Sequence, residues 1–167
     1  MAAAGAPEEY HLRAEGVTLA IVATRWNARV VESLTARAAT VAREFGAKVE
    51  VFHVDGALEL PVVVQACARR YDAVVALGCV IRGKTAHFNL VCDSLTTGLT
   101  RIALDEETPI GHGVLTVDDE DQAYERAGGA DAKEDRGADA VRAALSAAVE
   151  LGKIRTFPVK GYHQHRD

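Results

Sequence analysis

The chain of 167 residues contains only three cysteines and one tryptophan, and it carries no excess of positive charge. The cysteines, Cys67, Cys79 and Cys92, are an odd number and form no CxxC pair. This pattern argues against a disulfide framework and against a zinc site, both of which need paired or clustered thiols. It is typical of a reducing compartment, so we expect a cytoplasmic protein without a bound metal.

Positive charge is scarce along the whole sequence. Nineteen Lys and Arg residues stand against 24 Asp and Glu residues, which leaves a net charge of -5. No basic stripe is present, whereas nucleic-acid binding normally requires a basic face that neutralises phosphates. We therefore expect no nucleic-acid partner.

Long apolar runs are also absent. The first ten residues, MAAAGAPEEY, lack the basic and apolar regions of a signal peptide, and no later stretch approaches the length of a membrane span. We expect a soluble, unprocessed protein with no membrane partner. The length fits one domain over residues 1–167, with residues 1–16 and 158–167 as flexible ends.

Apolar runs alternate with segments of helical periodicity, which is typical of an α/β fold with a mostly parallel sheet. Helices are predicted at residues 31–45, from Pro61, at residues 87–102 and 118–126, and after a charged linker at residues 128–137. Gly46 is expected to end the first of them. Strands are predicted at residues 17–24, 49–54, 73–79 and 110–116.

The turn after the third predicted strand combines features of an anion site. Gly78 and Gly83 allow the backbone to turn sharply, and Thr85 is a candidate N-cap for the following helix. His87 then lies in or beside the first helical turn. Free N–H groups at a helix start attract anions, so the turn favours a bound phosphate.

Two cations, Arg82 and Lys84, flank this turn and would strengthen anion binding. The motif is neither a P-loop nor GxGxxG, however, and glycine-rich turns are common where a strand leads into a helix. An ordinary strand-to-helix connection therefore stays open as the alternative.

Polar residues also follow the other strands, and ligands of open parallel sheets bind beyond the carboxyl ends of the strands. Trp26 follows the first strand and would either stack on a flat heterocycle or pack in the core. Glu59 follows the second and would either accept hydrogen bonds from hydroxyls or lie solvated at a helix start. Gly111 and Gly113 interrupt the fourth strand and indicate close approach of another chain or a ligand.

Five motifs carry a resemblance that covers nearly the whole chain. They are Trp26-Asn27, DGALELP at residues 55–61, ALGCVIRGKTAHF at 76–88, GVLT at 113–116 and QAYERAGG at 122–129. In this order and spacing the sequence resembles the lumazine synthase family.

The resemblance implies a flavodoxin-like three-layer sandwich, with a four-stranded parallel sheet flanked by helices on both faces. It implies a transferase of riboflavin biosynthesis that condenses 5-amino-6-(D-ribitylamino)uracil with 3,4-dihydroxy-2-butanone 4-phosphate. The products are 6,7-dimethyl-8-ribityllumazine, phosphate and water, and no metal or organic cofactor takes part. It also implies a homopentamer whose active sites lie between neighbouring subunits.

Individual site residues follow from the same resemblance. Trp26 would stack on the pyrimidine ring, and His87 would be the proton acceptor. Lys84 and Thr85 would hold the phosphate at the helix start. The residues implied to hold the ribityl-bearing substrate are Ala57, Leu58, Glu59, Cys79, Val80 and Ile81.

His112 and Arg126 would reach in from the adjacent subunit, Arg126 to the phosphate. The chain departs from the family where His112 replaces a frequent phenylalanine, Asp55 a common proline, and Arg136 a second lysine. The linker at residues 128–137 is longer than in shell-forming relatives, which favours a free pentamer over an icosahedral shell.

Four alternatives accompany this interpretation. Cys79 beside His87 would suit a thiol nucleophile, although the implied reaction needs none. His163 and His165 would bind adventitious metal or lie solvated. Two rival functions are an archaeal-type riboflavin synthase and a non-catalytic lumazine or flavin binder, neither of which needs a site for a phosphorylated four-carbon sugar.

Overall fold

The structure is a computed structural model that describes Gly5 and residues 11–158. It confirms the four predicted strands and the five predicted helices, and adds one short 3-10 turn, η1. The elements are β1 (Thr18–Thr24), α1 (Ala28–Glu44), β2 (Lys48–Val54), η1 (Ala57–Glu59), α2 (Leu60–Ala68), β3 (Ala73–Ile81), α3 (His87–Asp105), β4 (Ile110–Val117), α4 (Glu120–Tyr124) and α5 (Arg136–Thr156).

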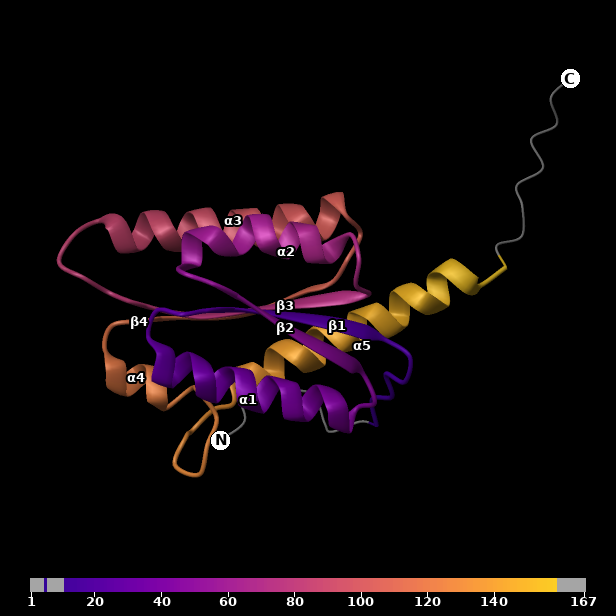
Figure 1. Cartoon of the computed structure of the whole chain (residues 1–167), viewed down its shortest axis with the longest axis horizontal. Helices are drawn as coiled ribbons and strands as arrows, with labels where there is room; N and C mark the ends of the chain where they lie inside the picture. The colour runs from indigo at the N-terminus through magenta and orange to yellow at the C-terminus, as the bar shows by residue number, and fades with distance from the viewer. Residues whose placement is uncertain (1–4, 6–10, 159–167) are drawn as a thin grey trace, which may run out of the picture.

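The strands form one sheet in the order β2-β1-β3-β4, and every pair is parallel. Figure 1 shows α2 and α3 on one face of this sheet and α1, α4 and α5 on the other. The expected three-layer α/β sandwich is therefore confirmed. All four strands have their carboxyl ends on the same side of the sheet, where the loops that follow them meet.

The central strands are continuously apolar because both of their faces are covered. On β1, Leu19 and Ile21 join the core cluster under α1 and α5, while Ala20 and Val22 join the cluster under α2 and α3. Each fully buried Val, Leu or Ile side chain stabilises the fold by about 1.5–3 kcal/mol relative to an exposed one. Alternation between two covered faces thus explains why no polar residue lies between Thr18 and Thr24, the two ends of β1.

Gly46 ends α1 as predicted. Its backbone has a φ of 89°, in the left-handed region that favours glycine, and its N–H donates to Arg43 O at 2.9 Å. Ala47 N donates to Ala42 O at 3.0 Å. These two bonds form a Schellman motif that satisfies the last carbonyls of the helix and directs the chain into β2.

Part of the N-terminal segment expected to be flexible is packed instead. Leu12 and Ala14 are buried, and Ala14 N donates to Phe45 O at 2.8 Å. The apolar side chains of this segment close the end of the core beside α1. His163 and His165 lie outside the described residues.

Three glycines play different parts from those predicted. Gly78 lies inside β3 rather than in a turn, and a Cβ atom there would come within 3.1 Å of Thr24 Cγ2 on the neighbouring strand. A Cβ on Gly111 would lie 2.3 Å from Ala140 O, and one on Gly113 would lie 3.2 Å from Ala140 Cβ. The close approach expected at β4 is therefore made by α5 of the same chain.

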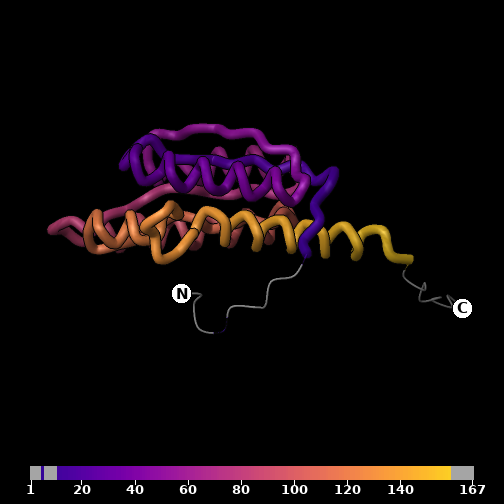
Figure 2. The backbone as a smooth tube through the Cα atoms, turned by 90° about the horizontal axis from the view of Figure 1, so that it is seen from below, coloured from indigo at the N-terminus to yellow at the C-terminus, as the bar shows by residue number. Residues whose placement is uncertain are grey.

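Helix α5 is longer than the sheet that it covers. Its buried residues, Gly137, Ala140, Val141, Ala144 and Leu145, all lie in its first half, and Figure 2 shows its last turns running past the rest of the chain. Among residues 11–158, no helix has the length and apolar character required to cross a lipid bilayer.

Candidate active site

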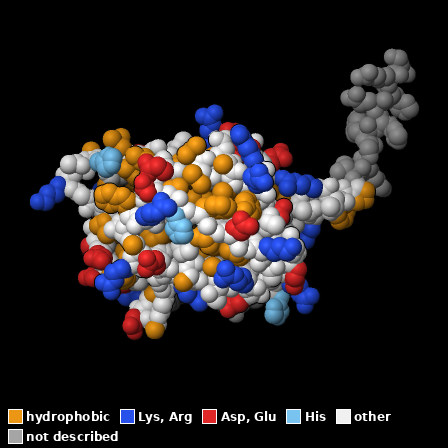
Figure 3. Space-filling model, in the orientation of Figure 1, with side chains coloured by type: hydrophobic (Ala, Val, Ile, Leu, Met, Phe, Trp, Pro, Cys, Tyr) orange, Lys and Arg blue, Asp and Glu red, His pale blue; other side chains and the backbone are white. Residues whose placement is uncertain are grey.

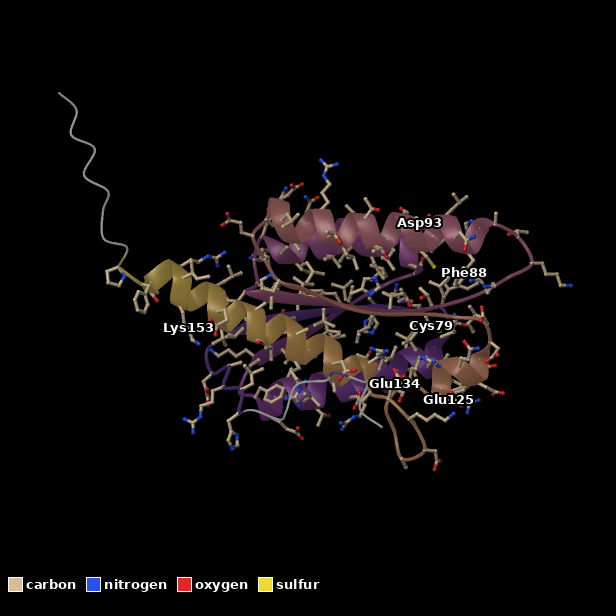
Figure 4. All side chains as sticks on the ribbon, turned by 180° about the vertical axis from the view of Figure 1, so that it is seen from behind. Cys79, Phe88, Asp93, Glu125, Glu134 and Lys153 are labelled. Atoms are coloured by element: carbon tan, nitrogen blue, oxygen red, sulfur yellow. The ribbon has the colours of Figure 1, made fainter. Side chains whose placement is uncertain are left out.

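A pocket of about 410 Å³ lies where β1, β2 and β3 end. We call it the strand-end pocket. Figure 4 shows Cys79 at this end of β3 and Phe88 on the first turn of α3. The pocket is lined by Thr24, Trp26, Asn27, Gly56, Ala57, Leu58, Glu59, Cys79, Val80, Ile81, His87 and Val91.

The structure thus brings most of the predicted site residues together around one space. Trp26, the segment 57–59, the segment 79–81 and His87 all contribute to the lining. They come from three loops that are far apart in sequence. The rule that ligand-binding loops gather beyond the carboxyl ends of parallel strands predicted this meeting correctly.

Trp26 offers an open aromatic surface at the pocket. Its side chain is 72% exposed, so the alternative that it packs in the core is wrong. The backbone N–H of Trp26 donates to Asp55 O at 3.2 Å, and this bond connects the loop after β1 to the loop after β2. Arg25 pairs with the Asp55 carboxylate at 2.9 Å and strengthens the same link.

Asn27 is a pocket residue that its side-chain type alone did not single out. Its backbone is left-handed, with a φ of 55°, a conformation that asparagine tolerates better than most residues. Its Nδ2 donates to Cys79 O at 2.8 Å. The side chain therefore connects the start of α1 to the end of β3, and the sequence signal was an asparagine in the short loop after the first strand.

The Glu59 side chain caps the start of the 3-10 turn η1. Its Oε2 accepts a hydrogen bond from Gly56 N at 2.8 Å, so the prediction of an exposed acid at a helix start is confirmed. The same residue also lines the strand-end pocket. The carboxylate retains its other oxygen as an acceptor for a hydroxyl group.

The turn at residues 82–86 is exposed and leads directly into α3. The helix begins at His87 with Ala86 as its N-cap, so the prediction that Thr85 is the N-cap is wrong by one residue. Thr85 Oγ1 still accepts a long hydrogen bond, 3.4 Å, from His87 N. Within residues 11–158, Lys84 forms no ion pair and does not line the strand-end pocket.

A second pocket, of about 230 Å³, lies along the open edge of β4. We call it the edge pocket, and its lining shares no residue with the strand-end pocket. It holds the predicted residues His112 and Arg126 together with Arg136. The full lining is His112, Gly113, Val114, Leu115, Thr116, Val117, Arg126 and Arg136.

Electrostatics differ among the residues of the edge pocket. Loss of water from around its ring lowers the pKa of His112, although the residue is still exposed in the single chain. Arg136 pairs with Glu134 at 2.7 Å. Arg126 donates from Nη1 to Gln122 O at 2.9 Å, and the same Nη1 lies 3.9 Å from Glu125 Oε2 in a loose ion pair.

Cys79 is unsuited to the role of a thiol nucleophile. Burial, with a smaller contribution from the charge of Glu120, raises the pKa of its thiol to about 11. At neutral pH the reactive thiolate is then about one part in 10⁴. This alternative loses its chemical basis, and Cys79 stays a wall of the pocket.

No three His, Cys, Asp or Glu side chains within residues 11–158 lie close enough to hold a metal ion together. The polar groups of the two pockets include two imidazoles, a carboxylate, an amide, two hydroxyls and two guanidinium groups. They can bind anions and hydroxyls and can move protons.

Comparison with known proteins decides the family. The model of the 6,7-dimethyl-8-ribityllumazine synthase family matches residues 16–151. The chain belongs to this family. The layered parallel sheet described above is consistent with the flavodoxin-like fold expected for a lumazine synthase.

Several curated lumazine synthases are similar over nearly their whole length. The chain is 56% identical to the 6,7-dimethyl-8-ribityllumazine synthase of Corynebacterium efficiens over 155 residues, which are 93% of this chain and 98% of the relative. It is 53% identical to that of Mycobacterium avium over 154 residues, 92% of this chain and 96% of the relative. The Thermobifida fusca enzyme is 54% identical over 156 residues, 93% and 91% of the two chains.

Proposed function

We propose that this protein condenses 5-amino-6-(D-ribitylamino)uracil with 3,4-dihydroxy-2-butanone 4-phosphate to form 6,7-dimethyl-8-ribityllumazine and phosphate. One observation carries the proposal. The strand-end pocket surrounds a single space with an open indole face, a carboxylate-bearing turn and a histidine at a helix start. A flat heterocycle, a polyol chain and a proton transfer require these three groups.

The ribitylaminouracil fits the side of the pocket formed by the first two loops. Its pyrimidine ring stacks on Trp26, because an exposed indole favours offset stacking on a flat ring. The ribityl hydroxyls bind to the turn Ala57–Glu59, whose backbone groups and carboxylate offer acceptors and donors. Val80 and Ile81 form the opposite wall.

The phosphorylated ketose fits the start of α3. The first N–H groups of this helix lack partners within the helix and carry a partial positive charge, which attracts phosphate. Lys84 stands beside them with an unpaired ammonium among residues 11–158, and Thr85 adds a hydroxyl. A phosphate held there brings the ketone close to His87.

The reaction then needs proton transfers rather than a metal. An amine and a ketone form an imine with loss of water. Elimination of phosphate then leaves a new carbonyl group, and the second amine condenses with it, with loss of a second water, to close the ring. His87 accepts and returns protons in these steps, since an imidazole ring offers both a proton acceptor and a proton donor. Most of the acceleration comes from holding two substrates in register, where effective molarities reach about 10⁵–10⁸ M.

We also propose that five copies form a ring, so that His112 and Arg126 of one subunit complete the strand-end pocket of its neighbour. The separation of the two pockets within one chain supports this arrangement. Both edge strands, β2 and β4, leave backbone groups unpaired. Figure 3 shows hydrophobic side chains gathered in the middle of the face that carries the β2 edge, with charged groups around them.

The connection between α4 and α5 supports a free pentamer. Ala127 and Asp135 form an antiparallel bridge, and Gly128 N donates to Glu134 O at 3.2 Å. The loop thus projects as a small hairpin instead of a short kink. Sedimentation velocity should give a particle of five 17.8 kDa chains, and a megadalton shell would overturn this part.

We propose further that residues 1–167 form one domain and that it works in the cytoplasm. The free thiols Cys67, Cys79 and Cys92 support a reducing environment. Cell fractionation with an antibody against the chain would test the location.

The activity is tested by mixing the purified protein with both substrates. Lumazine absorbance should rise together with one equivalent of free phosphate. Two outcomes would replace the proposal: riboflavin formed from lumazine alone indicates the archaeal-type synthase reaction, and a change in ligand fluorescence without phosphate release indicates a binding protein.

A further inference from the structure

Arg82 contacts three elements at once. Its N–H donates to Val117 O at 2.8 Å, and its Nε donates to Asp118 Oδ1 at 2.8 Å. Its guanidinium lies over the Phe88 ring, 4.2 Å from the centroid, and reaches Asn89 Oδ1 at 3.5 Å. The backbone and the side chain of Arg82 together thereby join the end of β3, the end of β4 and the first turn of α3.

These contacts fix both ends of the turn at residues 82–86. Arg82 is the first residue of the turn, and Phe88 follows it on α3, at the same end of the molecule as Cys79 (Figure 4). Within the turn the holding contacts are few. A Cβ on Gly83 would meet nothing within 4 Å, and Thr85 contributes the long bond to His87 N. The cation–π contact of Arg82 with Phe88 and its ion pair with Asp118 therefore determine where Lys84 and Thr85 lie.

Asp118 carries the link onward to α4. Its N–H donates to Gln122 Oε1 at 3.1 Å, and Gln122 O accepts from Arg126 Nη1 at 2.9 Å. A continuous path of polar contacts thus runs from Arg82 to Arg126. It connects the phosphate-binding turn beside the strand-end pocket with the cation of the edge pocket.

The charge of Arg82 is already used in this network. Its Nε is paired with a carboxylate at 2.8 Å, and the face of the guanidinium lies on an aromatic ring, a stacking that lysine reproduces poorly. Lys84, two residues further, has no such pairing among residues 11–158. Arg82 is thus placed to orient the turn, while Lys84 is placed to meet the anion.

We infer that Arg82 is a positioning residue that, through Asp118, sets the geometry of the phosphate turn in its own site and of Arg126 in the neighbouring site. This inference rests on the proposed function and deepens it. Chains of hydrogen-bonded and ion-paired groups can carry coupling between sites, and the path from Arg82 through Asp118 and Gln122 is such a chain.

The test is steady-state kinetics of Arg82→Ala, Arg82→Lys, Asp118→Ala and the Arg82→Ala/Asp118→Ala double variant, each varied against both substrates. We expect the KM for the phosphorylated ketose to rise about tenfold in both alanine variants, because small displacements of binding groups are costly. The KM for ribitylaminouracil should stay within about twofold, since Trp26 and residues 57–59 are untouched.

Two further results are expected. The double variant should be no worse than either single variant, because the two residues act as one unit. Arg82→Lys should recover only part of the loss, since it keeps the charge and lacks the planar donor geometry. Arg101→Ala is the matched control, because Arg101 Nε pairs with Asp105 at 3.1 Å on the exposed side of α3 and should leave both KM values unchanged.

Three outcomes would overturn the inference. A lower ketose KM in Asp118→Ala would mean that the freed Arg82 binds phosphate directly. An unchanged ketose KM in Arg82→Ala would remove any role for the residue. An equal rise of both KM values with a lower Tm would indicate a purely structural role. If the wild-type protein itself forms no lumazine, the proposed function fails first and the inference with it.

Discussion

The strand-end pocket and the edge pocket belong to the same sheet but are built differently. The first lies where three strands end, and its wall combines an indole, a carboxylate, an imidazole and apolar side chains. The second lies along one outer strand, and its wall is strand backbone with one imidazole and two guanidinium groups. The first offers shape for a substrate, and the second offers mainly charge.

This difference shows how a parallel sheet divides its functions. Loops at strand ends can enclose a ligand because they approach it from several directions. An open edge presents one row of groups and encloses nothing until another surface covers it. A site that needs both enclosure and cations can therefore arise when the edge of one copy meets the strand ends of another.

The largest effect is expected from a substitution that disturbs the packing of α5 on β4, the strand that lines the edge pocket. In Gly111→Ala the new Cβ would lie 2.3 Å from Ala140 O, a backbone atom, and 2.9 Å from Val75 Cγ2. We expect the free energy of unfolding to fall by about 3 kcal/mol or more, because β4 and α5 must separate. Denaturant unfolding followed by circular dichroism measures it.

The control for Gly111→Ala is Gly152→Ala. A Cβ on Gly152 would meet nothing within 4 Å, so alanine should stabilise α5 by up to about 1 kcal/mol through its helix propensity. An unfolding midpoint for Gly111→Ala equal to that of the wild type would contradict the close packing of α5 on β4.

The second prediction compares two variants, one with a substitution in each pocket. Trp26→Ala damages only the strand-end pocket, and Arg126→Ala only the edge pocket, so each should lower kcat/KM by about 10²-fold through lost stacking or a lost charge-assisted contact. Rings refolded from an equal mixture should regain activity, because about a quarter of the neighbouring pairs then combine two intact halves.

Recovery in the mixed rings is measured against each variant refolded alone. Mixtures that stay as inactive as the separate variants would show that both residues serve the site of their own chain. That result would break the comparison on which the ring proposal depends.

The third prediction concerns chemistry within the strand-end pocket. His87→Ala should lower kcat by about tenfold to hundredfold and leave the KM for ribitylaminouracil nearly unchanged, because proton shuttling is lost while substrate alignment remains. His53→Ala, which changes an exposed histidine outside both pockets, is the matched control in steady-state kinetics. A complete loss of turnover in His87→Ala would give the imidazole a larger share of catalysis than alignment.

The smallest effect on activity is expected for Cys79→Ala. With the pKa of this thiol raised to about 11, it carries almost no thiolate at neutral pH, and kcat/KM should stay within about twofold. A loss beyond hundredfold would restore the nucleophile hypothesis.

The thiol itself supplies an independent check in a Cys67→Ser/Cys92→Ser background. A raised pKa means that the thiolate forms only at higher pH, so iodoacetamide labelling of Cys79 at pH 8 should be about 10²-fold slower than that of a free thiol. The rate should keep rising up to about pH 11.

Local sequence patterns predicted the fold well where the signal was local. The apolar runs and the stripes at steps of three and four located every strand and helix, and Gly46 was correctly expected to end α1. One error was local, because the N-cap of α3 is Ala86 and not Thr85. Another was non-local. Gly78 resembled a turn residue in sequence, but it lies in β3, where a Cβ would come within 3.1 Å of Thr24 Cγ2 on the neighbouring strand.

The site was predictable to a similar extent. The strand-end rule gathered Trp26, the turn after β2 and His87. His112 and Arg126 were grouped only by the family resemblance, and no local pattern indicated that they lie at the open edge of β4. The two glycines of β4 signalled a close approach correctly, and its partner, Ala140, lies almost thirty residues further along. Periodicity does not encode such contacts, since they depend on which helix covers which strand.

Because the two pockets share no residue, the number of complete sites in the proposed assembly depends on whether the copies form a row or a ring. An open row of n copies completes n − 1 sites and leaves one bare pocket and one bare edge at its ends. A closed ring completes as many sites as it has chains. The one additional contact that joins the last copy to the first therefore completes one additional site.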